Sequence, residues 1–358
     1  MDRSLTSMNT LLPDQSLLVL VVLILMLLGL ALLLIGFTFL LRLRNEQELR
    51  LLAQLKRRWE PELFELLQDP HRLKTMWELV GEREHLAFLD FILPYAQRLE
   101  GSERDTLRRA AAPYLSEVLP LLKHRRIGTR ARAVQTLGTL GLPGFAQEVK
   151  GAIQDPSPFV AALASRLLAH ELGVEMAPEL CASLPRFKNF RIWYLVDMVA
   201  AMGPGAVPAI RETLEDLEMP VRTRAVAAHA LSVLRDLGSA DLAAELASGE
   251  RDPEFLAALL RLLSQVGTKA HSGAARAHLD SEEFFVRSAA TRTLSELGSK
   301  EDLPLLLERL NDPSAWVRMA AARGVYRLGG KAALRALTGP EDPATPLFKQ
   351  VLAEETGR

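Results

Sequence analysis

Arginine is the residue type whose spacing in this 358-residue chain first indicates chemistry. It recurs at one position of a repeated pattern, and in three cases an aspartate precedes it by six or seven residues. A column of guanidinium groups would bind anions, whereas Arg-Asp pairs at fixed repeat positions would join adjacent units through charge-assisted hydrogen bonds. We favour a structural ladder over a ligand site. The residues concerned are Arg130, Arg222, Arg287 and Arg318, with Asp216, Asp280 and Asp312.

A basic cluster and an aromatic group are the candidate partner-binding residues. The basic cluster would dock an acidic partner or lipid phosphates, although a solvated helix end has the same composition. The aromatic group more often belongs to a core than to an exposed interface hot spot. The basic cluster comprises Lys123, His124, Arg125, Arg126, Arg130 and Arg132. The aromatic group comprises Phe187, Phe190, Trp193 and Tyr194.

Catalytic and metal-binding motifs do not occur in the sequence. The seven histidines are scattered, and there is no H-E-x-x-H, C-x-x-C, G-x-x-x-x-G-K-[ST] or G-x-S-x-G motif. We therefore expect no enzyme activity, no catalytic residue, no bound metal and no cofactor. The net charge of −1 does not indicate a nucleic-acid partner.

The elements that position these residues begin with an apolar stretch, residues 17–41, which contains no charged side chain. At about 1.5 Å per residue, this transmembrane helix is long enough to cross a hydrocarbon layer of roughly 30 Å. A cleaved signal peptide is the alternative, but its apolar core would be shorter and its preceding flank basic. Basic residues follow the stretch, so we expect residues 1–16 outside and the larger part in the cytoplasm. The single Cys181 agrees with a reducing compartment.

The remaining chain divides into four predicted parts. Residues 42–60 form a basic juxtamembrane helix, whose arginines either contact anionic lipids or only fix the topology. Residues 61–120 are divergent amphipathic helices that cap the following array, with Pro61 expected in the first turn of a new helix. Residues 121–340 repeat, and residues 341–358 form a C-terminal tail.

The repeated part contains seven helices that each end in a glycine, at intervals of 29 to 35 residues. This period is typical of stacked helix pairs in a solenoid. We expect each glycine to end its helix in the left-handed conformation, and Asp-Pro turns to cap the helices. Strand-like alternation is absent, so the predicted fold class is all-α. The glycines are Gly141, Gly173, Gly203, Gly238, Gly267, Gly298 and Gly329.

The best-formed units, residues 312–329 (DPSAWVRMAAARGVYRLG) and 280–298, resemble bacterial HEAT-like repeats of the short phycobilisome-lyase type. The resemblance covers residues 121–340 and implies a right-handed α-solenoid of HEAT-like helix pairs. It indicates fold rather than function, because the consensus residues build the solenoid. Di-iron hydroxylases with HEAT-type repeats bind their metals through several His-Glu pairs, whereas only His170-Glu171 occurs here.

A solenoid behind a membrane anchor predicts a non-catalytic scaffold or adaptor that binds protein partners. The order of one span, LKRRWEPEL (55–63), KTMWELVGERE (74–84) and degenerate repeats is similar to bacterial inner-membrane proteins that accompany membrane glycosyltransferases for surface polysaccharide. The alternative is a lyase-like or chaperone-like component acting on a bound protein or chromophore. A sensor is a third interpretation, but 16 outer residues are too few to fold alone. The sequence does not indicate an oligomeric state.

Overall fold

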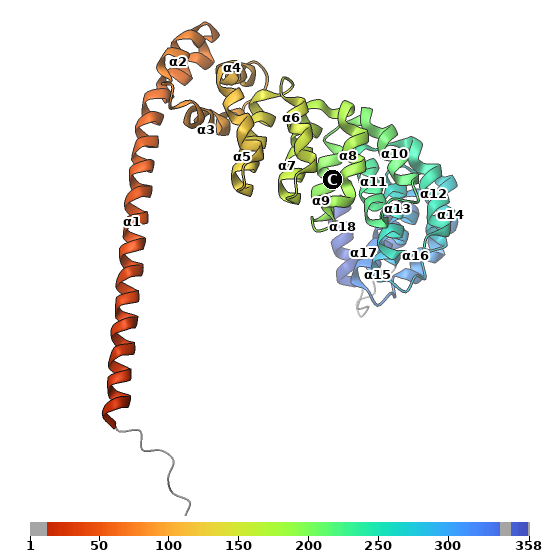
Figure 1. Cartoon of the computed structure of the whole chain (residues 1–358). Coiled ribbons are helices and arrows are strands. Elements are labelled where there is room, and N and C mark those ends of the chain that lie inside the picture. The colour runs from red at the N-terminus through yellow and green to blue at the C-terminus, as the bar shows by residue number, and fades with distance from the viewer. Residues whose placement is uncertain (1–12, 337–344, 357–358) are drawn as a thin grey trace, which may run out of the picture. The chain divides into compact units, whose positions relative to one another are not determined.

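The computed structural model describes residues 13–336 and 345–356, and within these residues all regular secondary structure is helical. The chain is therefore an all-α protein, as predicted. It divides into two compact units, Met1–Pro113 and Tyr114–Arg358. The second unit begins seven residues before the predicted start of the repeats. Figure 1 shows the helices of both units.

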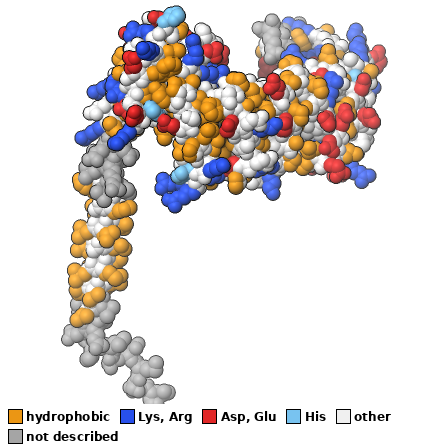
Figure 2. All heavy atoms as spheres, turned by 45° about the horizontal axis from the view of Figure 1, so that its top comes forward, with side chains coloured by type: hydrophobic (Ala, Val, Ile, Leu, Met, Phe, Trp, Pro, Cys, Tyr) orange, Lys and Arg blue, Asp and Glu red, His pale blue; other side chains and the backbone are white. Residues whose placement is uncertain are grey.

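Helix α1 (Pro13–Gln68) contains the apolar segment Leu20–Phe39, which has a mean hydropathy of 3.2 and no buried residue. Figure 2 shows hydrophobic side chains along this part of the helix. By length and composition the segment can cross a membrane, and a signal sequence would pass the same test. A second candidate, α9 with α10, is bent by 102° and packs within the repeat array.

Helix α1 continues through Pro61, so the prediction of a new helix at this residue is wrong. Proline cannot donate to the carbonyl group four residues earlier. Pro61 is exposed, and water can satisfy a carbonyl group on that side of the helix. Leu55, Trp59 and Leu63 are buried on the other side. Burial of this apolar face therefore outweighs the loss of one backbone hydrogen bond.

The core of the first unit forms around Trp59, which is 1% exposed. Its ring meets Phe88 edge-to-face at 5.4 Å and Phe91 at 5.6 Å between centroids. The Arg72 guanidinium makes two hydrogen bonds of 2.9 Å to the Glu62 carboxylate, which fastens the next turn to α1. The other helices of this unit are η1 (Pro70–Arg72), α2 (Leu73–Leu79), α3 (His85–Ala96) and α4 (Gly101–Ala111).

The second unit is a stack of helix pairs in two layers, preceded by η2 (Ala112–Lys123), which starts in the first unit. Consecutive second helices pack against one another and form one layer. In Figure 1 this layer lies on the inner side of the curve. It contains α5 (Ile127–Thr136), α7 (Pro158–Leu172), α9 (Ile192–Ala200), α11 (Val221–Leu234), α13 (Pro253–Val266), α15 (Phe284–Leu297) and α17 (Ala315–Ala336).

The first helices of the pairs form the outer layer, and the core lies between the two layers. Helix α17 is bent at Gly330, and α18 (Thr345–Thr356) packs against it. The first helices are α6 (Ala146–Gly151), α8 (Ala177–Ser183), α10 (Val207–Glu215), α12 (Ala240–Gly249), α14 (Ser272–Arg276) and α16 (Leu303–Arg309). The unit is thus an α-solenoid, as predicted.

The helix-ending glycines serve two different purposes. Gly173 and Gly203 have positive φ, 52° and 79°, which favours glycine, but their ψ of −116° and −178° lies outside the left-handed helical region that was predicted. Gly267 and Gly298 have φ of −72° and −69°, and Gly141, Gly238 and Gly329 also have no positive φ, so the prediction is wrong for these glycines. A Cβ atom on Gly267 would lie 2.6 Å from both the Leu263 carbonyl oxygen and Leu297 Cδ1. Glycine is needed there because the chain is crowded.

Close packing of α15 and α17 gives a first prediction. A Cβ atom on Gly324 would collide with Ser295 Oγ and lie 2.7 Å from Leu306 Cδ1. We expect Gly324→Ala to lower the free energy of unfolding by about 1 to 3 kcal/mol, because overpacking forces the neighbours apart. Gly273 in α14 is the matched control, since a Cβ atom there has no neighbour within 4 Å. Urea denaturation of both variants measures the effect. The prediction is contradicted if Gly324→Ala is no less stable than Gly273→Ala.

Candidate functional site

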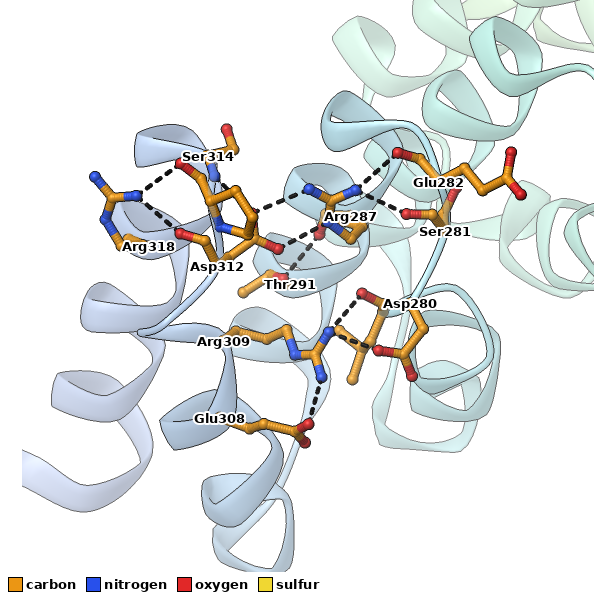
Figure 3. Close-up of polar contacts among 12 residues, drawn as sticks. Asp280, Ser281, Glu282, Arg287, Thr291, Glu308, Arg309, Asp312, Ser314 and Arg318 are labelled. Atoms are coloured by element: carbon orange, nitrogen blue, oxygen red, sulfur yellow. Dashed lines mark hydrogen bonds and ion pairs between the residues drawn. The ribbon is translucent and has the colours of Figure 1, made fainter.

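Arginines near the start of the second helices join adjacent repeats (Figure 3). The Arg287 guanidinium binds the Asp312 carboxylate through Nε at 2.7 Å and Nη2 at 3.1 Å. Its third nitrogen, Nη1, donates to the carbonyl oxygens of Ser281 and Glu282, both at 2.8 Å. Asp312 also accepts the backbone N–H of Ser314 at 2.8 Å. One guanidinium therefore closes the turn before its own helix and holds the turn of the next repeat.

The same arrangement recurs at the start of the array. Arg130 binds Asp155 at 2.7 and 2.9 Å, and its Nη1 donates to the carbonyl oxygens of His124 and Arg125. Asp155 accepts the backbone N–H of Ser157 at 2.8 Å. These hydrogen bonds occupy most of the polar capacity of both side chains, which is the condition for a partly buried ion pair to be stabilising.

The remaining residues of the predicted ladder have other partners. Arg318 donates to the carbonyl oxygens of Asp312 and Pro313, not to the Asp312 carboxylate. Asp280 binds Arg309 at 2.6 Å. The carboxylate partner therefore belongs to a neighbouring repeat rather than to the same turn. Asp216 accepts the backbone N–H of Glu218, and Arg222 donates to the carbonyl oxygen of Phe190.

A second set of inter-repeat ion pairs starts from the first helices and was missed by the sequence analysis. Arg211 binds Asp236, and Arg276 binds Asp302 at 2.6 and 3.1 Å. The sequence signal that would have found these pairs is a constant number of residues between each arginine and its aspartate. In both sets the aspartate follows its arginine by 25 or 26 residues, which is slightly less than one repeat.

The ladder carboxylates have shifted acidities. Hydrogen bonds from Arg130 lower the pKa of Asp155, against the opposing effect of burial. Arg276 likewise lowers the pKa of Asp302. Burial by itself would raise the pKa of Asp312, but the bonds from Arg287 and Ser314 outweigh it and lower the pKa. The ladder therefore needs these carboxylates in their charged form.

The predicted basic cluster lies at the turn before α5 and on that helix. Arg125 and Arg126 are exposed, and the backbone N–H of Arg126 donates to His124 Nδ1. Arg130 belongs to the ladder and points to Asp155 instead. Arg132 is exposed on the following turn of α5. The cluster is thus split between a structural arginine and exposed charges.

The predicted aromatic group is split as well. The rings of Phe187, Phe190 and Tyr194 pack together, with Phe190 and Tyr194 stacked at 5.5 Å between centroids. Trp193, on the same helix α9, points to α11 instead and is 49% exposed. Its ring lies 4.8 Å from that of His229, so the structure does not bring Trp193 and Tyr194 into one site.

A cluster on the second-helix layer, formed by Trp193, His229 and Arg261, was not predicted. The Arg261 guanidinium carbon lies 5.8 Å from the centre of the Trp193 ring. Burial, together with the charge of Arg261, lowers the pKa of His229 to about 4. His229 is therefore neutral at physiological pH, and the cluster carries the positive charge of Arg261 beside an exposed indole ring.

One family model matches part of the repeat array. The family described as HEAT repeats matches residues 239–325. A crystal structure of a Kap121p mutant is similar over 79% of this chain and 36% of that one, with 15% identity and a TM-score of 0.41. The chain thus spans about a third of that protein's length. No curated protein matches the chain. The described residues form an all-α solenoid in which residues 239–325 match HEAT repeats, and such repeats suggest a scaffold for protein–protein interaction.

The Arg287–Asp312 pair gives a second prediction. Asp312→Asn keeps an oxygen atom for the N–H of Ser314 but removes the charge that Arg287 binds. We expect the free energy of unfolding to fall by about 1 to 3 kcal/mol in urea denaturation, since a charge-assisted bond of a buried pair is lost. Asp241→Asn is the control, because the Asp241 side chain is 99% exposed where it contacts His271 Nε2. Equal effects of the two substitutions would contradict a special role for the ladder.

Acid should weaken the ladder, and Asp155 provides the test. Its pKa is lowered by folding, so its contribution is complete above the unfolded value of about 3.9 and is lost as the pH falls through the folded value. We expect the difference in unfolding free energy between wild type and Asp155→Asn to shrink from pH 7 to pH 3. Urea denaturation at each pH measures it. A difference independent of pH would contradict the prediction.

Proposed function

We propose that the chain is a membrane-tethered, non-catalytic scaffold that binds protein partners on its solenoid. The observation that carries the proposal is the fully exposed apolar segment Leu20–Phe39, which shares one helix with the start of the folded first unit. Leu25, Met26 and Leu33 are each at least 60% exposed. Apolar surface in water costs about 25 cal/mol per Å², and a bilayer removes this cost.

The distribution of charge supports an orientation with the solenoid in the cytoplasm. Arg50, Lys56 and Arg57 are exposed on α1 after the apolar segment. Positive charges flanking a span remain preferentially on the cytoplasmic side. Arg50 follows Phe39 by 11 residues, about 16 Å along a helix, and is the one of the three nearest to the end of the segment. A charge close to an anionic membrane surface adds about 1 kcal/mol.

The proposal that the solenoid binds protein partners is supported by the repeats themselves, since HEAT repeats typically bind proteins. Their second helices offer a continuous layer with exposed aromatic side chains, among them Trp193 at 49% and Trp316 at 70%. Tethering restricts this surface to the membrane and raises its effective concentration toward membrane partners. The specific version is an accessory of a membrane glycosyltransferase in a bacterial inner membrane.

No observation favours the lyase-like or chaperone-like alternative. In residues 13–336 and 345–356, no group of three or more His, Cys, Asp or Glu side chains is placed to hold a metal ion. The one His-Glu pair, His170 with Glu171, makes a contact of 3.2 Å near the end of α7. Both residues lie side by side in one helical turn, and a polar pair of this kind is common on a helix surface.

A charge in the middle of the apolar segment tests the anchor. We expect Leu27→Arg with Leu28→Arg to move the protein from the alkaline-washed membrane pellet to the soluble fraction, because each arginine costs about 2.5 to 3.5 kcal/mol at a bilayer centre. Leu51→Arg is the control, since Leu51 is exposed on α1 outside the segment. An N-terminal tag that is missing from the mature protein would instead indicate a cleaved signal peptide.

Crosslinking in cells tests the partner. We expect a lysine-reactive crosslinker, followed by detergent extraction and mass spectrometry, to join lysines of the repeats, such as Lys150 or Lys188, to a multi-pass membrane glycosyltransferase. Lys188 is exposed and Lys150 is partly exposed. Recovery of soluble proteins alone would refute the glycosyltransferase version while leaving a general scaffold in place. A coloured or metal-containing purified protein would refute the non-catalytic version.

A further inference from the structure

One cavity in the second unit combines unpaired positive charge with exposed aromatic rings. It has a volume of about 280 Å³ and lies between α13, α15 and α17 on the second-helix layer. Arg261 and Arg292 supply its charges, and Phe284, Phe285 and Trp316 supply its rings. The size suits one or two side chains of a bound segment rather than a large ligand.

The two arginines lack an acidic partner. Among the residues that the structure describes, no carboxylate lies within 4.0 Å of Arg261 or Arg292, whereas the ladder arginines nearby are paired. Burial lowers the pKa of Arg261, and the charge of Arg292 lowers it further, so the two guanidinium groups repel each other. An anion placed between them would relieve this repulsion.

The exposed aromatic rings of the cavity favour a carboxylate on a protein segment over a free phosphate. Trp316 is 70% exposed and Phe284 is 47% exposed, and Phe284 meets Phe285 edge-to-face at 5.7 Å. A free phosphate would satisfy the arginines but leave these rings in water. A protein segment with a carboxylate beside a bulky apolar side chain would satisfy both, and Trp and Arg are the residues enriched in protein interfaces.

The molecule contains an example of such a match one repeat further on. Arg323 follows Arg292 by 31 residues, as Arg292 follows Arg261, so the three occupy one repeat position. Arg323 binds the Glu354 carboxylate of α18 at 2.8 Å. On the same helix, Phe348 is 2% exposed and Val351 is fully buried. At this position of the array a carboxylate of α18 thus pairs with the arginine at the surface, and apolar side chains of the same helix are buried.

We propose that the cavity formed by Arg261, Arg292, Phe284, Phe285 and Trp316 binds a partner-protein segment in which Asp or Glu lies within one helical turn of a bulky apolar residue. The carboxylate lies between the two arginines, and the apolar side chain covers the Phe284 and Trp316 rings. This inference rests on the proposed scaffold function, because it specifies the chemistry of a partner.

The test is selection of random dodecapeptides, displayed on phage, on the full-length protein in detergent. We expect enriched peptides to carry Asp or Glu within four residues of Phe, Leu, Val or Trp. A selected peptide should lose at least tenfold in affinity when its acid is changed to the amide. It should lose as much on the Arg261→Gln or Arg292→Gln protein, and less than twofold on Arg251→Gln, whose exposed arginine lies outside the cavity.

Equal thermal unfolding midpoints of all these variants would show that the losses are local. The inference is overturned if no peptide is enriched, if the enriched peptides lack acids, or if Arg292→Gln and Arg251→Gln bind them equally. It is also overturned if Arg292→Gln instead abolishes binding to vesicles that contain anionic lipid. The peptide selection needs no membrane partner, so its failure would not affect the conclusions of the membrane-anchor and crosslinking experiments. Conversely, a cleaved N-terminus would refute the membrane anchor but would not affect the peptide selection.

Discussion

Stacking of the repeats depends on charges that would be costly if their partners were not in place. Arg287 and Asp312 are largely removed from water, with side-chain exposures of 15% and 4%. Such a pair is stabilising only when hydrogen bonds satisfy the remaining donors and acceptors. Two carbonyl groups and a backbone N–H supply these bonds. Because the donors come from one repeat and the acceptor from the next, the pair forms only when the two units are stacked in register.

The sequence predicts the all-α class and the repeats because both depend on local periodicity. The pairing inside the ladder could not be predicted in the same way. A spacing of six residues puts Asp312 and Arg318 close in the chain, yet the carboxylate points back to Arg287. The aromatic group has a related difficulty: Trp193 and Tyr194 are neighbours in the chain but point about 100° apart on a helix. Only the packing of adjacent helices decides which ring is exposed.

In helix α1, burial of one apolar face determines where the helix ends more strongly than the presence of a proline does. In Leu20–Phe39 apolar residues occupy every side of the helix, which suits a surrounding apolar solvent. Further along, Leu55, Trp59 and Leu63 form a single buried stripe, as in a helix that covers a protein core. Pro61 lies within this second part and does not end the helix. A sequence rule based on proline therefore fails where one face of the helix is already fixed by packing.

The last helix of the second-helix layer shows what kind of segment can pair with the arginines on the two helices before it, α13 and α15. A repeat array leaves an apolar face at its last unit, and a segment outside the repeat pattern must cover it. Helix α18 does this for α17, with Phe348 and Val351 buried and Glu354 bound to Arg323. The equivalent arginines of the two preceding repeats, Arg261 and Arg292, have the same position, but no carboxylate in the described part of the chain pairs with them. Arg261 is half-buried and Arg292 is exposed, and both line one cavity with the rings of Phe284, Phe285 and Trp316. A partner segment with a carboxylate would therefore supply there what Glu354 supplies to Arg323.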